Sequence, residues 1–227
     1  MKISPIKKQL IDPKKCIVFF DFDNTIATCD VFDDVVMRFS KDKRWITLEN
    51  KWREGKIGSK ECLEGQIKGI SITKRALDAH LSSIKLDPYF KILVNFLSAK
   101  RAKKMILSDN FDYVLKRILN HYSLQNLRVY SNKLQFSRDK LMPSFPFRHK
   151  SCKVCAHCKT KNLLANVRED SIIFYIGDGN SDICPAEYAD IVFAKEDLLK
   201  YCRDKKLCYI KYGSLKEVYG YFKKNMK

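Results

Sequence analysis

Three short apolar runs, each followed at once by acidic or glycine-rich residues, constrain the fold of this 227-residue chain most. The runs are 16–20 (CIVFF), 105–107 (MIL) and 171–176 (SIIFYI). They lack polar alternation and are separated by helical patterns, which is typical of strands buried on both faces of a parallel sheet. The sequence therefore predicts an α/β protein with a parallel sheet covered by helices.

Polar residues follow each of these runs directly, at the point where a strand would end. They are Asp21 and Asp23, Ser108 and Asp109, and the Gly177-Asp178-Gly179 segment. In open parallel sheets, ligands bind in the crevice beyond the carboxyl ends of the strands. We therefore expect these side chains, which are far apart in the sequence, to meet in one site.

The stretch between the first two runs is helical in character and has no strand-like segment. Helices are predicted at 31–39, after Thr73 as N-cap, and from Pro88 with Asp87 as N-cap. The apolar residues expected to be buried in them are Phe32, Val35, Val36, Phe39, Leu77, Leu81, Ile84, Ile92, Leu93, Phe96 and Leu97, with Trp45 and Trp52 in the same helical core. We predict that 29–96 form an inserted helical cap and that 1–28 and 97–227 form the α/β core.

Further elements are predicted after the second run. Asp109 or Asn110 is expected to cap a helix, whose buried residues would be Val114, Leu115, Ile118 and Leu119. Residues 129–147 are interpreted as a β-hairpin or an irregular excursion, and 191–193 and 208–210 as short late strands. His80 and His121 lie on predicted helices without a Ser or Cys partner, so structural roles are expected for both.

Asp21 and Asp23 belong to one tight turn, so their carboxylates are expected close together. Water or a metal ion must offset their repulsion. One carboxylate can attack phosphorus as a nucleophile, while its neighbour transfers the proton of the leaving group. Asp178 and Asp182, at a glycine-rich strand end, would complete a set of oxygen ligands for Mg²⁺. Alone, the D-x-D pair is also compatible with a turn or a helix cap.

Four motifs in a fixed order are more specific than any one of them. They are Asp21-x-Asp23-x-Thr25, Leu107-Ser108, Lys159, and Gly177-Asp178-Gly179-Asn-Ser-Asp182. Together they resemble the motifs of haloacid dehalogenase-like phosphatases, and they frame nearly the whole chain. The resemblance implies a Rossmann-like α/β core with an inserted helical cap, and a Mg²⁺-dependent phosphomonoesterase.

The same resemblance implies roles for the residues that would meet the phosphate. Asp21 would be the nucleophile that becomes an aspartyl-phosphate, and Asp23 the general acid and base. Thr25 would lie near the phosphate, and Ser108 would donate a hydrogen bond to a phosphoryl oxygen. Lys159 would neutralise both the nucleophile and the phosphate.

Metal ligands also follow from the resemblance. Asp21 and Asp178 would ligate Mg²⁺, the backbone carbonyl of Asp23 would reach it, and Asp182 would be a ligand or lie just behind the ligands. Ser181 stands where members of the group usually have Asn, so this chain departs from the pattern at one contact on the phosphate side.

Two narrower groups match in detail. The segments 21–26, Ser108-Asp109-Asn110 and 177–185 resemble the phosphoethanolamine/phosphocholine and pyridoxal phosphate phosphatases. The segments 155–159 and 193–202 resemble at least as much the diketo-methylthiopentyl phosphate phosphatase of methionine salvage. All share a phosphoserine-phosphatase-like core, and the expected partner is a small phosphorylated metabolite of either type.

Asp30 and Asp109 are the residues expected to contact the leaving group of that metabolite. Asp30 lies where phosphoserine phosphatases carry an acidic residue that meets the substrate amine, and Asp109 follows Ser108. Two more carboxylates near the crevice would favour a cationic or hydroxyl-rich leaving group. The alternative is that each residue merely caps a helix, a role that contributes about 1 kcal/mol.

Cys152, Cys155 and Cys158 lie close together with His149 and His157. Thiolate and imidazole suit a tetrahedral zinc site. Structural zinc sites usually draw two ligand pairs from separated segments, and a second pair is missing here. The other interpretation is a turn of reduced thiols that delivers Lys159 to the phosphate.

The formal net charge of +18 raises a different function class. It fits a nucleic-acid-binding protein, or a phosphatase of nucleic-acid ends, but the basic residues are scattered, which is typical of a solvated surface. Nucleic acid is therefore not the expected partner. The sequence begins without the apolar region of a signal peptide and has no run of about 18 apolar residues, so a cytoplasmic protein without a membrane partner is expected.

Overall fold

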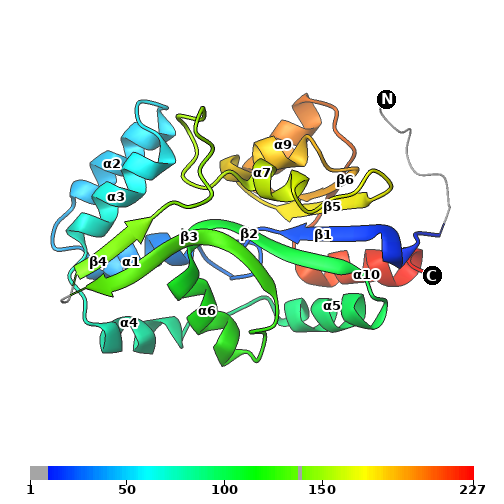
Figure 1. The fold of residues 1–227 in the computed structure, drawn as a ribbon, viewed down its shortest axis with the longest axis horizontal. Coiled ribbons are helices and arrows are strands. Elements are labelled where there is room, and N and C mark those ends of the chain that lie inside the picture. The colour runs from blue at the N-terminus through cyan, green and yellow to red at the C-terminus, as the bar shows by residue number, and fades with distance from the viewer. Residues whose placement is uncertain (1–9, 138–139) are drawn as a thin grey trace.

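The computed structural model describes residues 10–137 and 140–227, and within them a seven-stranded sheet crosses the molecule (Figure 1). The strands are β1 (Cys16–Phe20), β2 (Lys103–Phe111), β3 (Arg128–Ser137), β4 (Lys140–Ser144), β5 (Ile172–Gly177), β6 (Ile191–Ala194) and β7 (Tyr209–Lys211). Their order in the sheet is β4-β3-β2-β1-β5-β6-β7, and only the β3–β4 hairpin is antiparallel. The predicted α/β class, its three buried runs, the hairpin and the late strands are confirmed.

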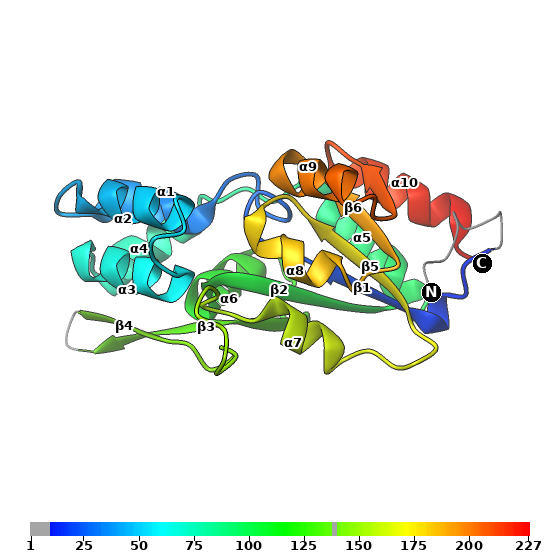
Figure 2. The same ribbon diagram turned by 90° about the horizontal axis from the view of Figure 1, so that it is seen from above.

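Helices cover both faces of the sheet (Figures 1 and 2). One face carries α5 (Pro88–Ala99), α6 (Asp112–His121) and α10 (Leu215–Asn225); the other carries α7 (Lys159–Leu164), α8 (Ile183–Ala186) and α9 (Glu196–Asp204). Alternate residues of β1 feed the two cores, with Val18 and Phe20 on the first face and Ile17 and Phe19 on the second. Short 3₁₀ helices, η1 (Pro13–Lys15) and η2 (Asn180–Asp182), complete the core. Strand β1 is apolar throughout because both of its faces are buried.

Four helices lie beyond the carboxyl ends of the strands and form what we call the cap (Figure 1). They are α1 (Val31–Phe39), α2 (Arg44–Arg53), α3 (Ser59–Gly69) and α4 (Lys74–Leu81). The chain leaves and re-enters the core where Ala27 bridges Leu86, flanked by hydrogen bonds from Thr28 N to Lys85 O and from Asp87 N to Ile26 O. The side-chain caps predicted at Thr73 and Asp87 are both present.

The helix α5 belongs with the core by its contacts. It packs against α10 and β2, and Phe90 packs edge-on against Phe20 of β1, with ring centroids 5.5 Å apart. The predicted cap boundary at 96 falls inside this helix, ten residues after the Leu86 bridge. Ile92 was expected to be buried in this helix but is 45% exposed. The buried face of the helix consists of Phe90, Leu93, Val94 and Leu97 instead.

The predicted helix cap at Asp109 or Asn110 is wrong. Strand β2 continues through both residues to Phe111, and α6 begins without a side-chain cap. The face predicted for this helix, Val114, Leu115, Ile118 and Leu119, is buried as expected. Across the described residues, every helix is too short or too polar to cross a bilayer.

Candidate active site

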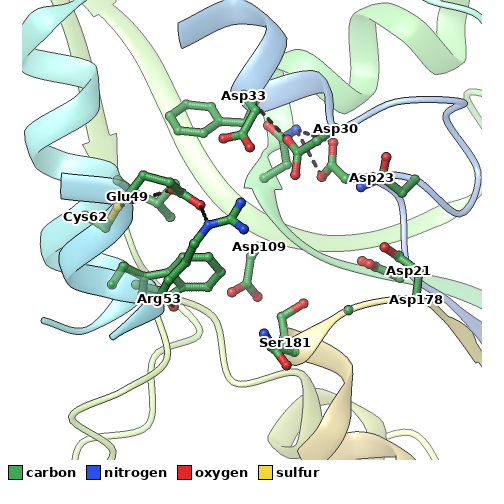
Figure 3. A pocket seen from close by; sticks show the side chains of 18 of the residues that line it. Asp21, Asp23, Asp30, Asp33, Glu49, Arg53, Cys62, Asp109, Asp178 and Ser181 are labelled. Atoms are coloured by element: carbon green, nitrogen blue, oxygen red, sulfur yellow. Dashed lines mark hydrogen bonds and ion pairs between the residues drawn. The ribbon is translucent and has the colours of Figure 1, made fainter. Parts of the chain in front are cut away.

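A cavity of about 260 Å³ lies between the carboxyl ends of β1, β2 and β5 and the cap. Figure 3 shows carboxylates entering it from several sides: Asp21 and Asp178 together, Asp23 and Asp30 beside them, and Asp109 across the cavity. Of the residues expected to meet in one site, Asp21, Asp23, Asp109, Asp178 and Gly179 line this cavity, because parallel strands bring their carboxyl ends to one edge, whereas Ser108 and Gly177 do not line it.

Lys159 lies at the floor of the cavity between two carboxylates. Its Nζ donates to Asp21 Oδ1 and Asp182 Oδ1, each at 2.7 Å, and to Ser181 Oγ at 2.8 Å. The lysine side chain is only 2% exposed. Burial acts to lower the pKa of Lys159, but Asp182 and Asp21 raise it well above its usual value, so the ammonium stays charged.

Asp182 is fully occupied by protein donors. Its Oδ1 also accepts from the Tyr175 hydroxyl at 2.6 Å, and its Oδ2 accepts from the backbone N–H groups of Asp178 and Gly179. A Cβ on Gly177 would lie 2.3 Å from Asp182 Oδ2, so any larger residue there would displace the Asp182 carboxylate from its donors. Asp182 thus anchors Lys159 and the β5 turn, which favours the position behind the ligands over direct ligation.

A cluster of three carboxylates offers a place for a cation. One oxygen each of Asp21, Asp178 and Asp182 lies within 4.8 Å of the others, the single such cluster of His, Cys, Asp and Glu in the described chain. Burial and Asp182 raise the pKa of Asp21 well above its usual value, and the same causes raise the pKa of Asp178 to about 6. Excess negative charge of this kind, on hard oxygen donors, fits Mg²⁺.

Thr25 supports this cluster from behind. Its hydroxyl donates to Asp178 Oδ1 at 2.9 Å and lies 3.4 Å from the Tyr212 hydroxyl, and the residue is 3% exposed. Thr25 does not line the cavity. In this structure its hydroxyl therefore holds a carboxylate of the cluster and is turned away from the space expected for the phosphate.

Asp23 points toward the cap side of the cavity and is held by two donors. The Val31 N–H donates to Oδ1 at 2.9 Å, and Asn110 Nδ2 donates to Oδ1 at 3.0 Å and Oδ2 at 3.2 Å. Burial and Asp30 raise the pKa of Asp23 well above its usual value, although both donors oppose them. Asn110 was expected only as a possible helix cap; its place directly after Ser108-Asp109 was the signal that could have found it.

Ser108 and Asp109 differ in their exposure to the cavity. Ser108 is fully buried, and its Oγ accepts from the Asn110 N–H at 3.0 Å. Asp109 lines the cavity, while its backbone carbonyl accepts from Asn132 Nδ2 at 2.6 Å. Burial raises the pKa of Asp109 to about 6. Asp109 is thus available to a ligand, whereas Ser108 lies just behind the lining residues.

The cap closes the cavity with acidic and aromatic side chains. Asp30 caps α1 by accepting from the Asp33 N–H at 2.9 Å, and it also lines the cavity, so both of its expected roles fit the geometry. Glu49 accepts from Arg53 Nε at 2.9 Å (Figure 3). Trp52, expected in the helical core, lines the cavity instead and donates to Ser59 Oγ at 3.0 Å.

Residues 145–158, between β4 and α7, form what we call the Lys159 loop. It holds Cys152, Cys155 and Cys158, all free thiols, and Cys158 is the N-cap residue of α7. The Cys155 N–H donates to Cys152 Sγ at 3.4 Å. Within the described residues these thiols do not belong to a cluster with metal-site geometry.

A buried lysine between two carboxylates, a second aspartate two residues after the first, and a helical cap over a parallel sheet define a haloacid dehalogenase-like phosphatase. The chain belongs to the family described as "Putative Phosphatase", whose model matches residues 16–204. The predicted enzyme class, a phosphoric monoester hydrolase, is thereby confirmed.

Relatives of known activity cover nearly the whole chain. Polyol phosphate phosphatase PYP1 of Saccharomyces cerevisiae is 26% identical over 222 residues, which are 90% of this chain and 91% of the relative. A 2-hydroxy-3-keto-5-methylthiopentenyl-1-phosphate phosphatase of Geobacillus thermodenitrificans is 27% identical over 201 residues, 86% and 89% of the two chains. The second matches one of the two groups that the sequence resembles.

Solved structures show the same fold. A HAD family hydrolase from Salmonella enterica serovar Typhi superposes with a TM-score of 0.72 at 20% identity, covering 91% of this chain and 70% of that one. A phospho-aspartyl intermediate analogue of phosphoserine phosphatase superposes with a TM-score of 0.68 at 17% identity, covering 97% and 100%.

Proposed function

We propose that this protein is a Mg²⁺-dependent phosphomonoesterase that works through an aspartyl-phosphate at Asp21. The observation that carries the proposal is the arrangement at Asp21: Lys159 donates to Oδ1 at 2.7 Å, and no donor of the described residues reaches Oδ2. An oxygen with a free lone pair beside a fixed cation is what a carboxylate nucleophile needs. Asp23 lies two residues after Asp21 in the same turn. Its pKa is raised, so it can hold the proton that a general acid must donate.

In this mechanism Asp21 Oδ2 attacks phosphorus and the bond to the leaving-group oxygen breaks. Asp23 donates its proton to that oxygen, and then takes a proton from the water that hydrolyses the aspartyl-phosphate. Lys159 holds the phosphoryl oxygens, while Ser108, which is fully buried, lies behind the residues that line the cavity. Mg²⁺, held by Asp21 and Asp178 with the Asp23 backbone carbonyl, would offset the charge of nucleophile and phosphate.

The cap wall supports a hydroxyl-rich or cationic leaving group. Asp30, Asp33 and Glu49 lie on it, and Asp109 faces them across the cavity. Carboxylates accept hydrogen bonds from hydroxyl groups and attract ammonium groups. The name of the yeast relative, a polyol phosphate phosphatase, agrees with the first of these. We expect the substrate to be a small polyol-like or amine-bearing phosphate.

The cavity does not favour nucleic acid. Its volume of about 260 Å³ is slightly below the roughly 300–1,000 Å³ of typical small-ligand pockets. Its acidic lining would repel the backbone of a polyanion, although the chain as a whole carries +18. A phosphate ester with a small leaving group fits both the size and the charge.

The experiment that tests the proposal is Asp21→Asn. Removing the nucleophile should lower turnover of an aryl phosphate by about a thousandfold or more, while circular dichroism and the melting temperature show a folded protein. Asp170→Asn is the matched control, because that side chain is 64% exposed and, among the described residues, pairs with Lys15 alone. Turnover retained by Asp21→Asn would overturn the nucleophile assignment.

A screen of phosphate esters tests the substrate class. With Mg²⁺ present, phosphate release from glycerol phosphate and phosphoethanolamine should exceed release from an oligonucleotide with a terminal phosphate. EDTA should abolish the activity, and added Mg²⁺ should restore it. Preference for the oligonucleotide would favour the nucleic-acid-end phosphatase instead.

A further inference from the structure

Two buried polar atoms face each other without hydrogen bonds at the floor of the site. Within residues 10–137 and 140–227, neither Asp109 Oδ1 nor His157 Nδ1 has a hydrogen-bond partner, and 4.0 Å separates the two atoms. The His157 side chain is 0% exposed, and the Asp109 side chain is 24% exposed and lines the cavity. Buried polar atoms in native proteins are nearly always paired, so this pair of atoms needs a physical explanation.

The other side of the His157 ring shows which nitrogen carries the proton. Asn162 Nδ2 lies 2.6 Å from His157 Nε2 and 3.3 Å from the carbonyl oxygen of Cys158. A carbonyl oxygen can only accept, so the amide group that faces it is the NH₂, and this NH₂ also donates to Nε2. The neutral ring must then carry its hydrogen on Nδ1, the atom that faces Asp109.

The ring is also neutral under ordinary conditions. Burial and the charge of Lys159 lower the pKa of His157 to about 3, against an opposing contact with the Ser108 backbone. When a carboxylate approaches to within about 3.2 Å, a neutral Nδ1–H donor forms a hydrogen bond to it rather than an ion pair. Such bonds in active sites are often long without substrate and tighten when it binds.

We propose that His157 is a positioning residue, whose Nδ1–H donates to Asp109 Oδ1 and aims that carboxylate at the leaving group of the substrate. This inference rests on the proposed function. Asn132 already holds the backbone of Asp109 through its carbonyl oxygen. The Asp109 side chain can still rotate, and His157 would restrict that rotation. His157 lies in the Lys159 loop, so the loop that leads directly into Lys159, the cation near the phosphate, also supplies the support for the leaving-group side.

The effect of losing the donor follows from the charges nearby. Lys159 attracts the Asp109 carboxylate and Asp182 repels it. Without the Nδ1–H donor, Asp109 is expected to turn toward Lys159 and away from the leaving group. Binding of a hydroxyl-rich or amine-bearing substrate should therefore suffer more than binding of an aryl phosphate, which has no group for Asp109 to hold.

Kinetics of His157→Leu and His157→Asn test the proposal, on glycerol phosphate or phosphoethanolamine, whichever the wild type turns over faster, and on p-nitrophenyl phosphate. His157→Leu should raise KM for the first substrate about tenfold or more, with a smaller change in kcat and a several-fold smaller loss on the aryl phosphate. The Asn amide can donate from near the Nδ1 position, so His157→Asn should recover most of the loss. His149→Asn, on the exposed part of the same loop, is the control. Equal losses on both substrates, or no recovery by Asn, would overturn the positioning role.

A spectroscopic readout is independent of activity. NMR of protein labelled at the histidine nitrogens should show His157 as the Nδ1–H tautomer, and Asp109→Asn should move that resonance. A proton on Nε2, or a resonance unchanged in Asp109→Asn because the bond goes to Ser108, would overturn the proposal. If the wild type hydrolyses no phosphate ester, the proposed function fails, but this spectrum still decides whether His157 contacts Asp109.

Discussion

Asp23 is the side chain on which release of the leaving group would depend. Burial and Asp30 favour its protonated form, whereas Asn110 and the Val31 N–H favour the carboxylate. The first pair prevails, so Asp23 holds a proton that it can give. Asn110 donates to both oxygens, which fixes the plane of the carboxyl group, and the same bonds act to lower the pKa of Asp23.

Asn110→Ala tests this role of Asn110. Because hydrogen bonds to the charged form lower a pKa, their loss should raise the pKa of Asp23 further and move the basic limb of the kcat profile to higher pH. Lost orientation should lower kcat by about ten- to a hundredfold. The measurement is kcat against pH, with Asn126→Ala, an exposed asparagine, as the control. A lower kcat with an unmoved basic limb would contradict Asp23 as the acid.

The cap meets the Lys159 loop where α3 begins. The Ser59 N–H donates to the Val154 carbonyl oxygen at 2.7 Å. A Cβ on Gly58 would lie 2.4 Å from the Lys153 carbonyl oxygen, which is backbone and cannot swing away. The cap therefore rests directly on the segment that leads into Lys159, so we expect closure of the cavity and placement of the lysine to be linked.

Gly58→Ala should separate these two elements. We expect KM for the substrate to rise about threefold or more, because the N-terminus of α3 must move away from the loop. Steady-state kinetics and the melting temperature measure both effects. Gly220→Ala is the matched control: Gly220 is exposed within α10 with nothing near its Cβ position, so Ala should stabilise the fold by about 0.5–1 kcal/mol and leave KM unchanged. An unchanged KM in Gly58→Ala would show that the contact does not control closure.

Charge is distributed unevenly over the whole molecule. The chain carries +18, yet the cavity gathers acidic side chains. Burial raises the pKa of Asp33 to about 7, and the pKa values of Asp109 and Asp178 to about 6. Between about pH 4 and 7 the folded state thus binds more protons at these groups than the unfolded state, so this contribution to stability falls as pH rises. His157 has the opposite effect because its pKa is lowered. Between about pH 3 and 6.5 its contribution to stability rises as pH rises.

Mg²⁺ should therefore stabilise the protein more at pH 7.5 than at pH 5. A cation replaces the protons that the carboxylates lose, whereas at pH 5 it must compete with them. At a concentration of about 100 times Kd, stabilisation of roughly 2.7 kcal/mol should raise Tm by about 5–10 °C at pH 7.5. Thermal melts with EDTA or Mg²⁺ at the two pH values measure this. Asp178→Asn should abolish most of the difference; an equal shift at both pH values would contradict it.

The sequence by itself determined the sheet, the place of the site and most of its charged residues. Apolar runs bounded by Asp or Gly are local signals, since a strand buried on both faces must be apolar throughout and must end where polar groups begin. The edge at which parallel strands end is set by topology, so Asp21, Asp23 and Asp178 could be placed together from order alone. Thr73 and Asp87 were predictable as N-caps, because capping is an interaction within a few residues.

Only the tertiary structure decided how side chains far apart in sequence are oriented. Thr25 turned to Asp178, Trp52 to the cavity, and Asn110 to Asp23. The helix α5 joined the core because its buried face met α10, a partner more than a hundred residues later. His157 and Asp109 came face to face in the same way. Periodicity shows that a face is buried or that a group is polar, but its partner depends on packing between distant segments, which no local pattern encodes.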